Sequence, residues 1–137
     1  MSIPARYRPQ LEQDANNQLV ITIGTDDPCL LLYPLQEWES LEQKIESLPS
    51  FNKAARRVQR LLIGHATEVE LDTSGRILVP PLLRDYAKLE KTIMLVGQGK
   101  KFEIWSEAQW EANRQDWLAI DSSEDKDFPA ELMSLSI

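Results

Sequence analysis

The sequence predicts an α+β fold, rich in β-strand, that is built from two copies of one structural unit. The main observation is an internal repeat, in which residues 3–8, 19–24 and 31–33 recur in the same order as residues 79–84, 93–97 and 103–105. A second observation is the alternation of short apolar runs with Gly, Asp and Pro, which is typical of strands joined by turns. Other segments carry apolar residues three or four apart, which predicts helices.

The spacing of the repeat indicates a duplication. Pro4 and Pro80 are 76 residues apart, whereas Trp38 and Trp110 are 72 apart, a drift that small changes in loop length explain. Each copy is too short to form a good core and would leave strand edges unpaired. We therefore expect the two copies to interlock as a pseudo-dimer with one shared core, and such chains to close into a ring-like homo-oligomer.

In the first copy, residues 19–23 and 29–33 predict a hairpin around the turn-forming residues 24–28. After Pro34 the apolar residues fall three or four apart as far as Leu48, which predicts an amphipathic helix with the proline near its first turn. Ser50 is expected to be the N-cap of a second helix, and Gly64 is expected to end it.

In the second copy we expect strands over residues 66–71, 77–79, 92–96 and 102–105, with a tight turn at residues 72–75 between the first two. Helices are expected over residues 81–86 and 106–117, and the acidic residues 121–127 predict a loose linker to a short final segment. The predicted domains are a first repeat at residues 1–37, connecting helices at 38–65, a second repeat at 66–109, and a C-terminal helix with an acidic tail at 110–137.

Composition argues against several classes of protein. The net charge of −7 means that any nucleic-acid surface must be local. His65 is the only histidine and Cys29 the only cysteine, and no phosphate-cradling Gly-rich loop is present, so we expect no catalysis, metal site, cofactor or small-molecule substrate. Cys29 is interpreted as a small buried hydrophobe. Without a bilayer-spanning apolar stretch or a signal peptide, we expect a cytoplasmic protein and no membrane partner.

The predicted turn carries the most distinctive chemistry. Asp72 can accept backbone N–H bonds from Ser74 or Gly75, and Gly75 can adopt the positive φ that a hairpin turn requires. Arg76 is then held where the returning strand begins, and a fixed guanidinium is well suited to bidentate contact with phosphate or guanine. The alternative is an exposed Asp72–Arg76 ion pair worth ~0–1 kcal/mol.

Three further arginines occupy related positions. Arg84 in the second copy corresponds to Arg8 in the first, and Arg6 lies two residues before Arg8. Arg6, Arg8 and Arg84 could flank the same surface and hold phosphates. Equally, arginines in short helices can cap carbonyl groups or pair with Asp85 and Glu90, and the residues alone leave both alternatives open.

Taken in order, these motifs resemble the MraZ family. The resemblance rests on Asp72-x-x-x-Arg76 with residues 77–80, on Leu83-Arg84, on residues 30–38 and on residues 56–64. It implies tandem AbrB-like swapped-hairpin repeats that form a pseudo-dimeric β-barrel core with peripheral helices. Family members carry Asp-x-x-x-Arg in both copies, so either the first hairpin lies upstream of Met1 or this protein has lost half of its paired motif, and we expect the former.

The resemblance implies a transcriptional regulator of the division and cell-wall gene cluster that is cytoplasmic and nucleoid-associated. Its partner would be double-stranded DNA, bound at short G-rich direct repeats in the promoter of its own operon. The DNA-binding residues would be Arg76, Asp72, Gly75, Arg6, Arg8 and Arg84. Two alternatives remain: an AbrB-type antitoxin that binds a toxin, and a protein-assembly module that does not bind DNA.

Overall fold

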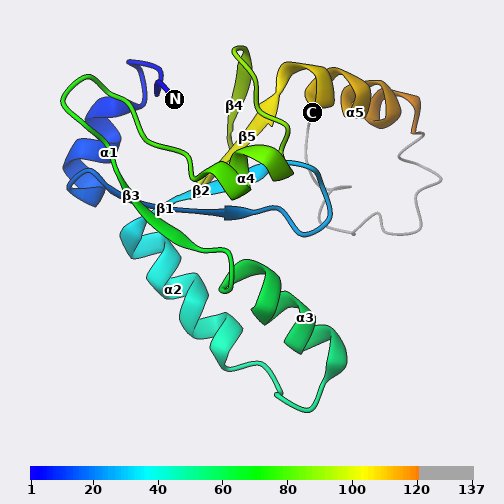
Figure 1. The fold of residues 1–137 in the computed structure, drawn as a ribbon. Helices are drawn as coiled ribbons and strands as arrows, with labels where there is room; N and C mark the ends of the chain where they lie inside the picture. The colour runs from blue at the N-terminus through cyan, green and yellow to red at the C-terminus, as the bar shows by residue number, and fades with distance from the viewer. Residues whose placement is uncertain (121–137) are drawn as a thin grey trace, which may run out of the picture.

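The structure is a computed structural model that describes residues 1–120, apart from the side chains of residues 13–15. The linker and final segment expected beyond residue 120 lie outside the described residues. Helices and strands follow one another as α1 (Arg8–Ala15), β1 (Gln18–Ile23), β2 (Leu30–Pro34), α2 (Leu35–Glu46), α3 (Lys53–Leu62), β3 (Thr67–Glu70), α4 (Pro81–Tyr86), β4 (Ile93–Gly97), β5 (Phe102–Ser106) and α5 (Glu107–Ala119) (Figure 1). The predicted α+β class is confirmed.

The strands form one antiparallel sheet in the order β3-β1-β2-β5-β4. Its central pair, β2 and β5, joins the two copies, with Leu30 opposite Ile104 and Leu32 opposite Phe102. By the 72-residue offset of the repeat, Leu30 corresponds to Phe102 and Leu32 to Ile104. The two pairs therefore exchange under a local two-fold axis, which confirms the interlocked pseudo-dimer.

The expected barrel is wrong, because the sheet of the described residues is open and has β3 and β4 as its edges. The predicted strand at residues 77–79 is also wrong. This segment stays outside the sheet, and its backbone pairs with the start of the chain, where Ser2 bridges Arg76 and Ile77 donates its N–H to the Met1 carbonyl at 2.8 Å. Since β3 lies on the outer edge of β1, the two-fold relation predicts that the edge of β4 can accept a strand in the same way.

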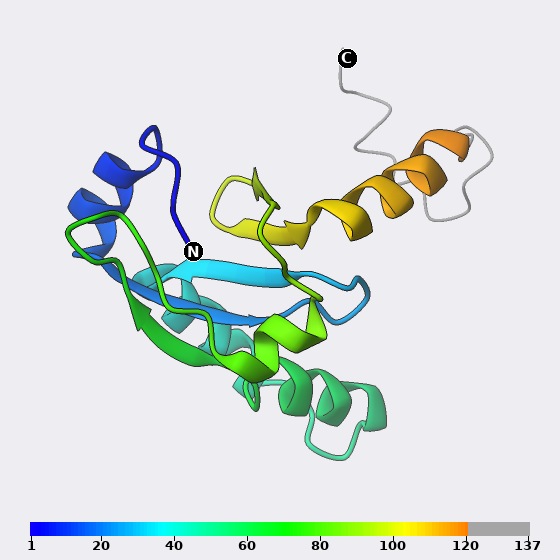
Figure 2. The ribbon, with the colours of Figure 1, turned by 45° about the horizontal axis from the view of Figure 1, so that its top comes forward.

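Both faces of the sheet are buried, so the core has two layers. On β1, Leu19 and Ile21 face one cluster and Val20 faces the other. The first cluster is covered by residues near Met1, by α1 and by the segment from Leu71 through α4. The second is covered by α2, α3 and α5, and Figures 1 and 2 show α2 and α3 together beneath the sheet.

Local capping explains where the helices begin. As expected, Pro34 immediately precedes α2. The expected cap of α3 is wrong, because the side chain of Asn52, and not that of Ser50, accepts the Ala55 N–H at 3.0 Å. Ser106 caps α5 by accepting the Gln109 N–H at 3.1 Å. None of the helices within residues 1–120 has the length and apolar character needed to span a bilayer.

Candidate nucleic-acid interface

The turn after β3 is fixed by the Asp72 side chain and by its own backbone. Asp72 Oδ1 accepts the N–H groups of Ser74 at 2.8 Å and of Arg76 at 2.9 Å. The Asp72 carbonyl accepts the Gly75 N–H at 3.0 Å, and the Asp72 N–H returns to the Arg76 carbonyl at 2.9 Å. Of the two donors expected for the carboxylate, Ser74 is correct, whereas Gly75 bonds to the backbone and Arg76 takes its place.

Gly75 meets two requirements at once. Its φ of +75° is the left-handed conformation expected from the sequence, and the residue is buried. The guanidinium of Arg8 covers it so closely that a Cβ at this position would lie 2.1 Å from Arg8 Nε. A side chain at position 75 would therefore be strained in its backbone and would displace Arg8.

Arg8 of the first repeat contacts the turn of the second repeat. Its Nε donates to the Ile3 carbonyl at 2.8 Å, and Ile3 in turn donates its N–H to the Gly75 carbonyl at 2.8 Å. The Ile3 backbone thus joins the first repeat to the turn of the second, and the Arg8 side chain packs over both Ile3 and Gly75. The half-buried Arg8 is held by the protein, and it retains further N–H groups that can face a ligand.

The Arg76 side chain is exposed at the turn. Among the side chains that the structure describes, it has no hydrogen-bond or ion-pair partner, and the one ion pair among them joins Arg114 to Glu111. The alternative of an Asp72–Arg76 ion pair is thus not realised in this structure. The Asp72 carboxylate instead positions the backbone from which the Arg76 guanidinium projects.

Arg84 and the Arg76 turn both lie near the Met1 amine. This amine donates to the Ile77 carbonyl at 2.9 Å. Its pKa is lowered by partial burial and then by the positive charges of Arg84 and Arg76, while Asp72 acts in the opposite direction. Both arginines therefore contribute to one positive region around the start of the chain.

Arg6 does not join the turn through any contact of the described residues. Its guanidinium lies 4.8 Å from the centre of the Tyr7 ring, a cation–π arrangement. The structure accordingly brings Asp72, Gly75, Arg76 and Arg8 together, associates Arg84 with them, and leaves Arg6 exposed to one side.

The fold separates this region from the main acidic helix. Figures 1 and 2 show the β3–α4 connection beside α1, on the side of the sheet away from α2. The acidic side chains of α2 are Glu37, Glu39, Glu42 and Glu46. A chain with a net charge of −7 can in this way present a local positive surface.

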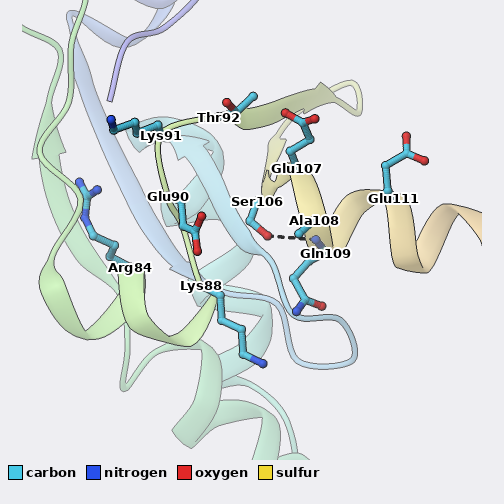
Figure 3. A pocket seen from close by; sticks show the side chains of 10 residues that line it. All are labelled: Arg84, Lys88, Glu90, Lys91, Thr92, Ser106, Glu107, Ala108, Gln109 and Glu111. Atoms are coloured by element: carbon cyan, nitrogen blue, oxygen red, sulfur yellow. Dashed lines mark hydrogen bonds between the residues drawn. The ribbon is translucent and has the colours of Figure 1, made fainter.

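A cavity of about 840 Å³ adjoins Arg84 but differs in character. Figure 3 shows Arg84, Lys88 and Lys91 on the side of α4, whereas Glu107 and Glu111 come from α5. Glu90 adds a further negative charge, so basic and acidic groups balance around the space. This balance gives no preference for phosphate, and we do not assign the cavity to the interface.

Sequence reasoning missed the part played by the start of the chain. Met1, Ser2 and Ile3 hold the turn through backbone bonds, which no side-chain pattern reveals. The one available signal was the repeat itself, because Ile3 matches Val79 and both are buried. Cys29 is buried as expected, and burial, followed by the charges of Glu103 and Asp27, raises the pKa of its thiol to about 12.

Comparison with known proteins identifies the family. The model of the MraZ protein family, described as antitoxin-like, matches twice, at residues 1–61 and 62–128. A protein named transcriptional regulator MraZ from Coxiella burnetii is 59% identical over all 137 residues and is covered to 90% of its own length. A protein of the same name from Legionella pneumophila is 50% identical over 137 residues, which cover 90% of its length. Another from Marinomonas is 54% identical over 125 residues, which cover 83% of its length. The chain therefore belongs to the MraZ family of transcriptional regulators.

Proposed function

We propose that this chain regulates transcription by binding double-stranded DNA through the Asp72–Arg76 turn. Its target would be short G-rich direct repeats in the promoter of its own operon, at the head of the division and cell-wall gene cluster. It would act in the cytoplasm, on the nucleoid, as a ring-like homo-oligomer. The observation that carries the proposal is the exposed Arg76 guanidinium, which is mounted on a turn fixed by Asp72 and backed by Arg8.

The geometry suits recognition of guanine. A guanidinium offers two parallel N–H donors that match O6 and N7 of guanine in the major groove. Because the turn is fixed before DNA arrives, little conformational entropy is lost on binding. Asp72 and Gly75 would position Arg76, while Arg8, Arg84 and Arg6 would contribute phosphate contacts that set the register on the duplex.

Multiple copies compensate for the small size of one turn. A single turn makes few contacts, but rigidly linked turns raise the effective concentration of each next contact. Such avidity adds ~10²–10⁴ over the affinity of a single site. Direct repeats in DNA match a protein that presents the same turn at regular intervals.

The test compares two DNA duplexes by fluorescence anisotropy. One carries the promoter with its direct repeats, and the other carries the same bases in shuffled order. The proposal predicts tighter binding to the ordered repeats. With 6–10 phosphate contacts it also predicts a loss of ~10³–10⁵ in affinity between 50 and 200 mM salt. Equal binding to both duplexes at every salt concentration would contradict sequence-specific recognition.

The family description as antitoxin-like keeps one alternative open. An antitoxin would bind a small protein partner in addition to its operator. Co-expression with neighbouring genes, followed by purification of the full chain, would distinguish the two. A stoichiometric partner that releases the promoter DNA would favour the antitoxin function.

A further inference from the structure

The short helix α1 contacts the Asp72–Arg76 turn from both of its ends. At the start of α1, the guanidinium of Arg8 lies over Gly75, near the end of the turn. After the end of α1, the chain passes through Asn17 into β1. The Asn17 carbonyl accepts the N–H of Leu71, the residue before the turn, at 2.8 Å. The first of these contacts comes from a side chain, and the second comes from the backbone.

The bond between Asn17 and Leu71 continues the pairing of β1 with β3 to the base of the turn. The register of the two strands places Gln18 opposite Glu70, so Asn17 opposite Leu71 is the next pair. Leu71 is 3% exposed, and a buried backbone N–H that loses its partner is unfavourable. The place where the turn leaves the sheet therefore depends on the direction of the Asn17 carbonyl.

The backbone of Asn17 has a conformation that few residues adopt. Its φ of +63° is left-handed, a region that asparagine tolerates better than most residues with a side chain. The preceding Asn16, with a φ of +51°, already ends α1 in the left-handed conformation that is common at helix ends. The cap does not require a second left-handed residue. The conformation of Asn17 instead sets the direction in which the chain enters β1, and with it the carbonyl that Leu71 contacts.

The backbone of Asn17, and not its side chain, makes the described contact with Leu71. The side-chain oxygen Oδ1 is buried and has no hydrogen-bond partner in the part of the chain that the structure describes. Glycine, which adopts the left-handed conformation freely, should therefore replace Asn17 without losing the contact. A β-branched residue should not, because a positive φ is strongly unfavourable for it.

We propose that Asn17 is a positioning residue of the DNA-binding turn, which it holds through the N–H of Leu71. This inference rests on the proposed function and names a residue that prepares the same site. When this hold is lost, DNA must restore the position of the turn, and the cost appears as lost affinity for the ordered repeats. Phosphate contacts dominate binding to a shuffled sequence, so the affinity for a shuffled duplex should change little.

The first test is native-state hydrogen exchange on the full chain, followed by NMR. In Asn17→Val the Leu71 amide should exchange about 2- to 12-fold faster, as expected for the loss of one backbone hydrogen bond. The amide of Leu32, in the central strand β2, reports global unfolding and is used to correct for it. Asn17→Gly should keep the wild-type exchange rate at Leu71.

Asn16→Val is the matched control. Asn16 is also left-handed, but its carbonyl accepts no hydrogen bond from the turn among the described residues. This variant should lower global stability without the local effect at Leu71. Asn17→Ala, which has a smaller backbone cost than Asn17→Val, repeats the test if the valine variant does not fold.

The second test measures fluorescence anisotropy with the ordered and the shuffled duplex. Asn17→Val should lose about 2- to 12-fold in affinity for the ordered repeats per engaged turn and bind the shuffled duplex as the wild type does. Equal exchange at Leu71 in Asn16→Val and Asn17→Val, a loss of affinity in Asn17→Gly, or equal losses on both duplexes would overturn the proposal. A wild-type chain that prefers neither duplex contradicts the proposed function, whereas exchange at Leu71 still decides whether Asn17 holds the turn.

Discussion

Replacement of Gly75 by alanine perturbs the candidate interface where the two repeats meet. A left-handed backbone at a residue with a Cβ costs roughly 1–2 kcal/mol. The new Cβ would also lie 2.1 Å from Arg8 Nε, so Arg8 must move and give up its bond to the Ile3 carbonyl. A lost hydrogen bond of this kind costs about 0.5–1.5 kcal/mol. The sum predicts that Gly75→Ala lowers the free energy of unfolding by roughly 1.5–3.5 kcal/mol.

Gly99 offers a matched control within the same chain. Its φ of +73° nearly equals that of Gly75, but nothing lies within 4 Å of a Cβ placed there. Gly99→Ala should therefore show the backbone cost alone, about 1–2 kcal/mol by urea denaturation. In an Arg8→Ala background the additional cost at Gly75 should disappear. Equal losses for Gly75→Ala and Gly99→Ala would refute the contact with Arg8, as would an unchanged difference after Arg8 is removed.

Three other predictions concern single groups. Asp72→Ala should lower the free energy of unfolding by about 1 kcal/mol in urea denaturation, because two backbone N–H groups lose their acceptor, and it should weaken DNA binding in anisotropy. Asp72→Asn keeps one carbonyl oxygen as an acceptor, so it should lose less stability and less affinity. Asn52→Ala should cost ~1 kcal/mol in urea denaturation through loss of the α3 cap, and Ser50→Ala should cost less. Cys29 should resist alkylation by iodoacetamide at pH 8 until denaturant is added. Because its folded pKa is raised from 9.0 to about 12, stability should fall as pH rises through that window, and Cys29→Ala should flatten the decline.

Much of the fold could be predicted from local patterns. The β1–β2 and β4–β5 hairpins form where β-branched and aromatic runs flank turn residues, and α2 begins where Pro34 and the apolar spacing indicate. The repeat also predicted that the copies interlock, and the β2–β5 pairing shows this directly. These features depend on residues close together in the sequence or on the duplication, both of which a sequence displays.

The failures involve contacts between distant segments. Residues 77–79 have the composition of a strand, but a strand requires a ladder partner, and among the described residues this segment makes backbone bonds to residues near Met1 and no ladder with the sheet. The barrel fails because β3 and β4 stay on opposite edges of the sheet. The cap of α3 shows a subtler limit, since Ser50 and Asn52 are both good caps and the helix register decides between them.

The candidate site was partly visible in the sequence. Asp72, Gly75 and Arg76 lie within one turn, so turn chemistry alone predicts the carboxylate acceptor and the positive φ. The contact of Arg8 with Gly75 joins the two repeats, and no local pattern predicts it. The structure thus adds a positioning role for Arg8 to the phosphate contact proposed from the sequence.

The affinity of the Arg76→Ala variant for promoter DNA decides whether the Asp72–Arg76 turn binds DNA. Arg76 is exposed and pairs with nothing else in the described residues, so its removal should change stability by no more than about 0.5 kcal/mol. A lost bidentate guanine contact should weaken binding about 5- to 150-fold for each turn engaged. Arg114→Ala, which removes an equal charge from α5, should leave the affinity for the direct repeats almost unchanged. Equal affinities for Arg76→Ala and Arg114→Ala would contradict the assignment of this turn to DNA binding.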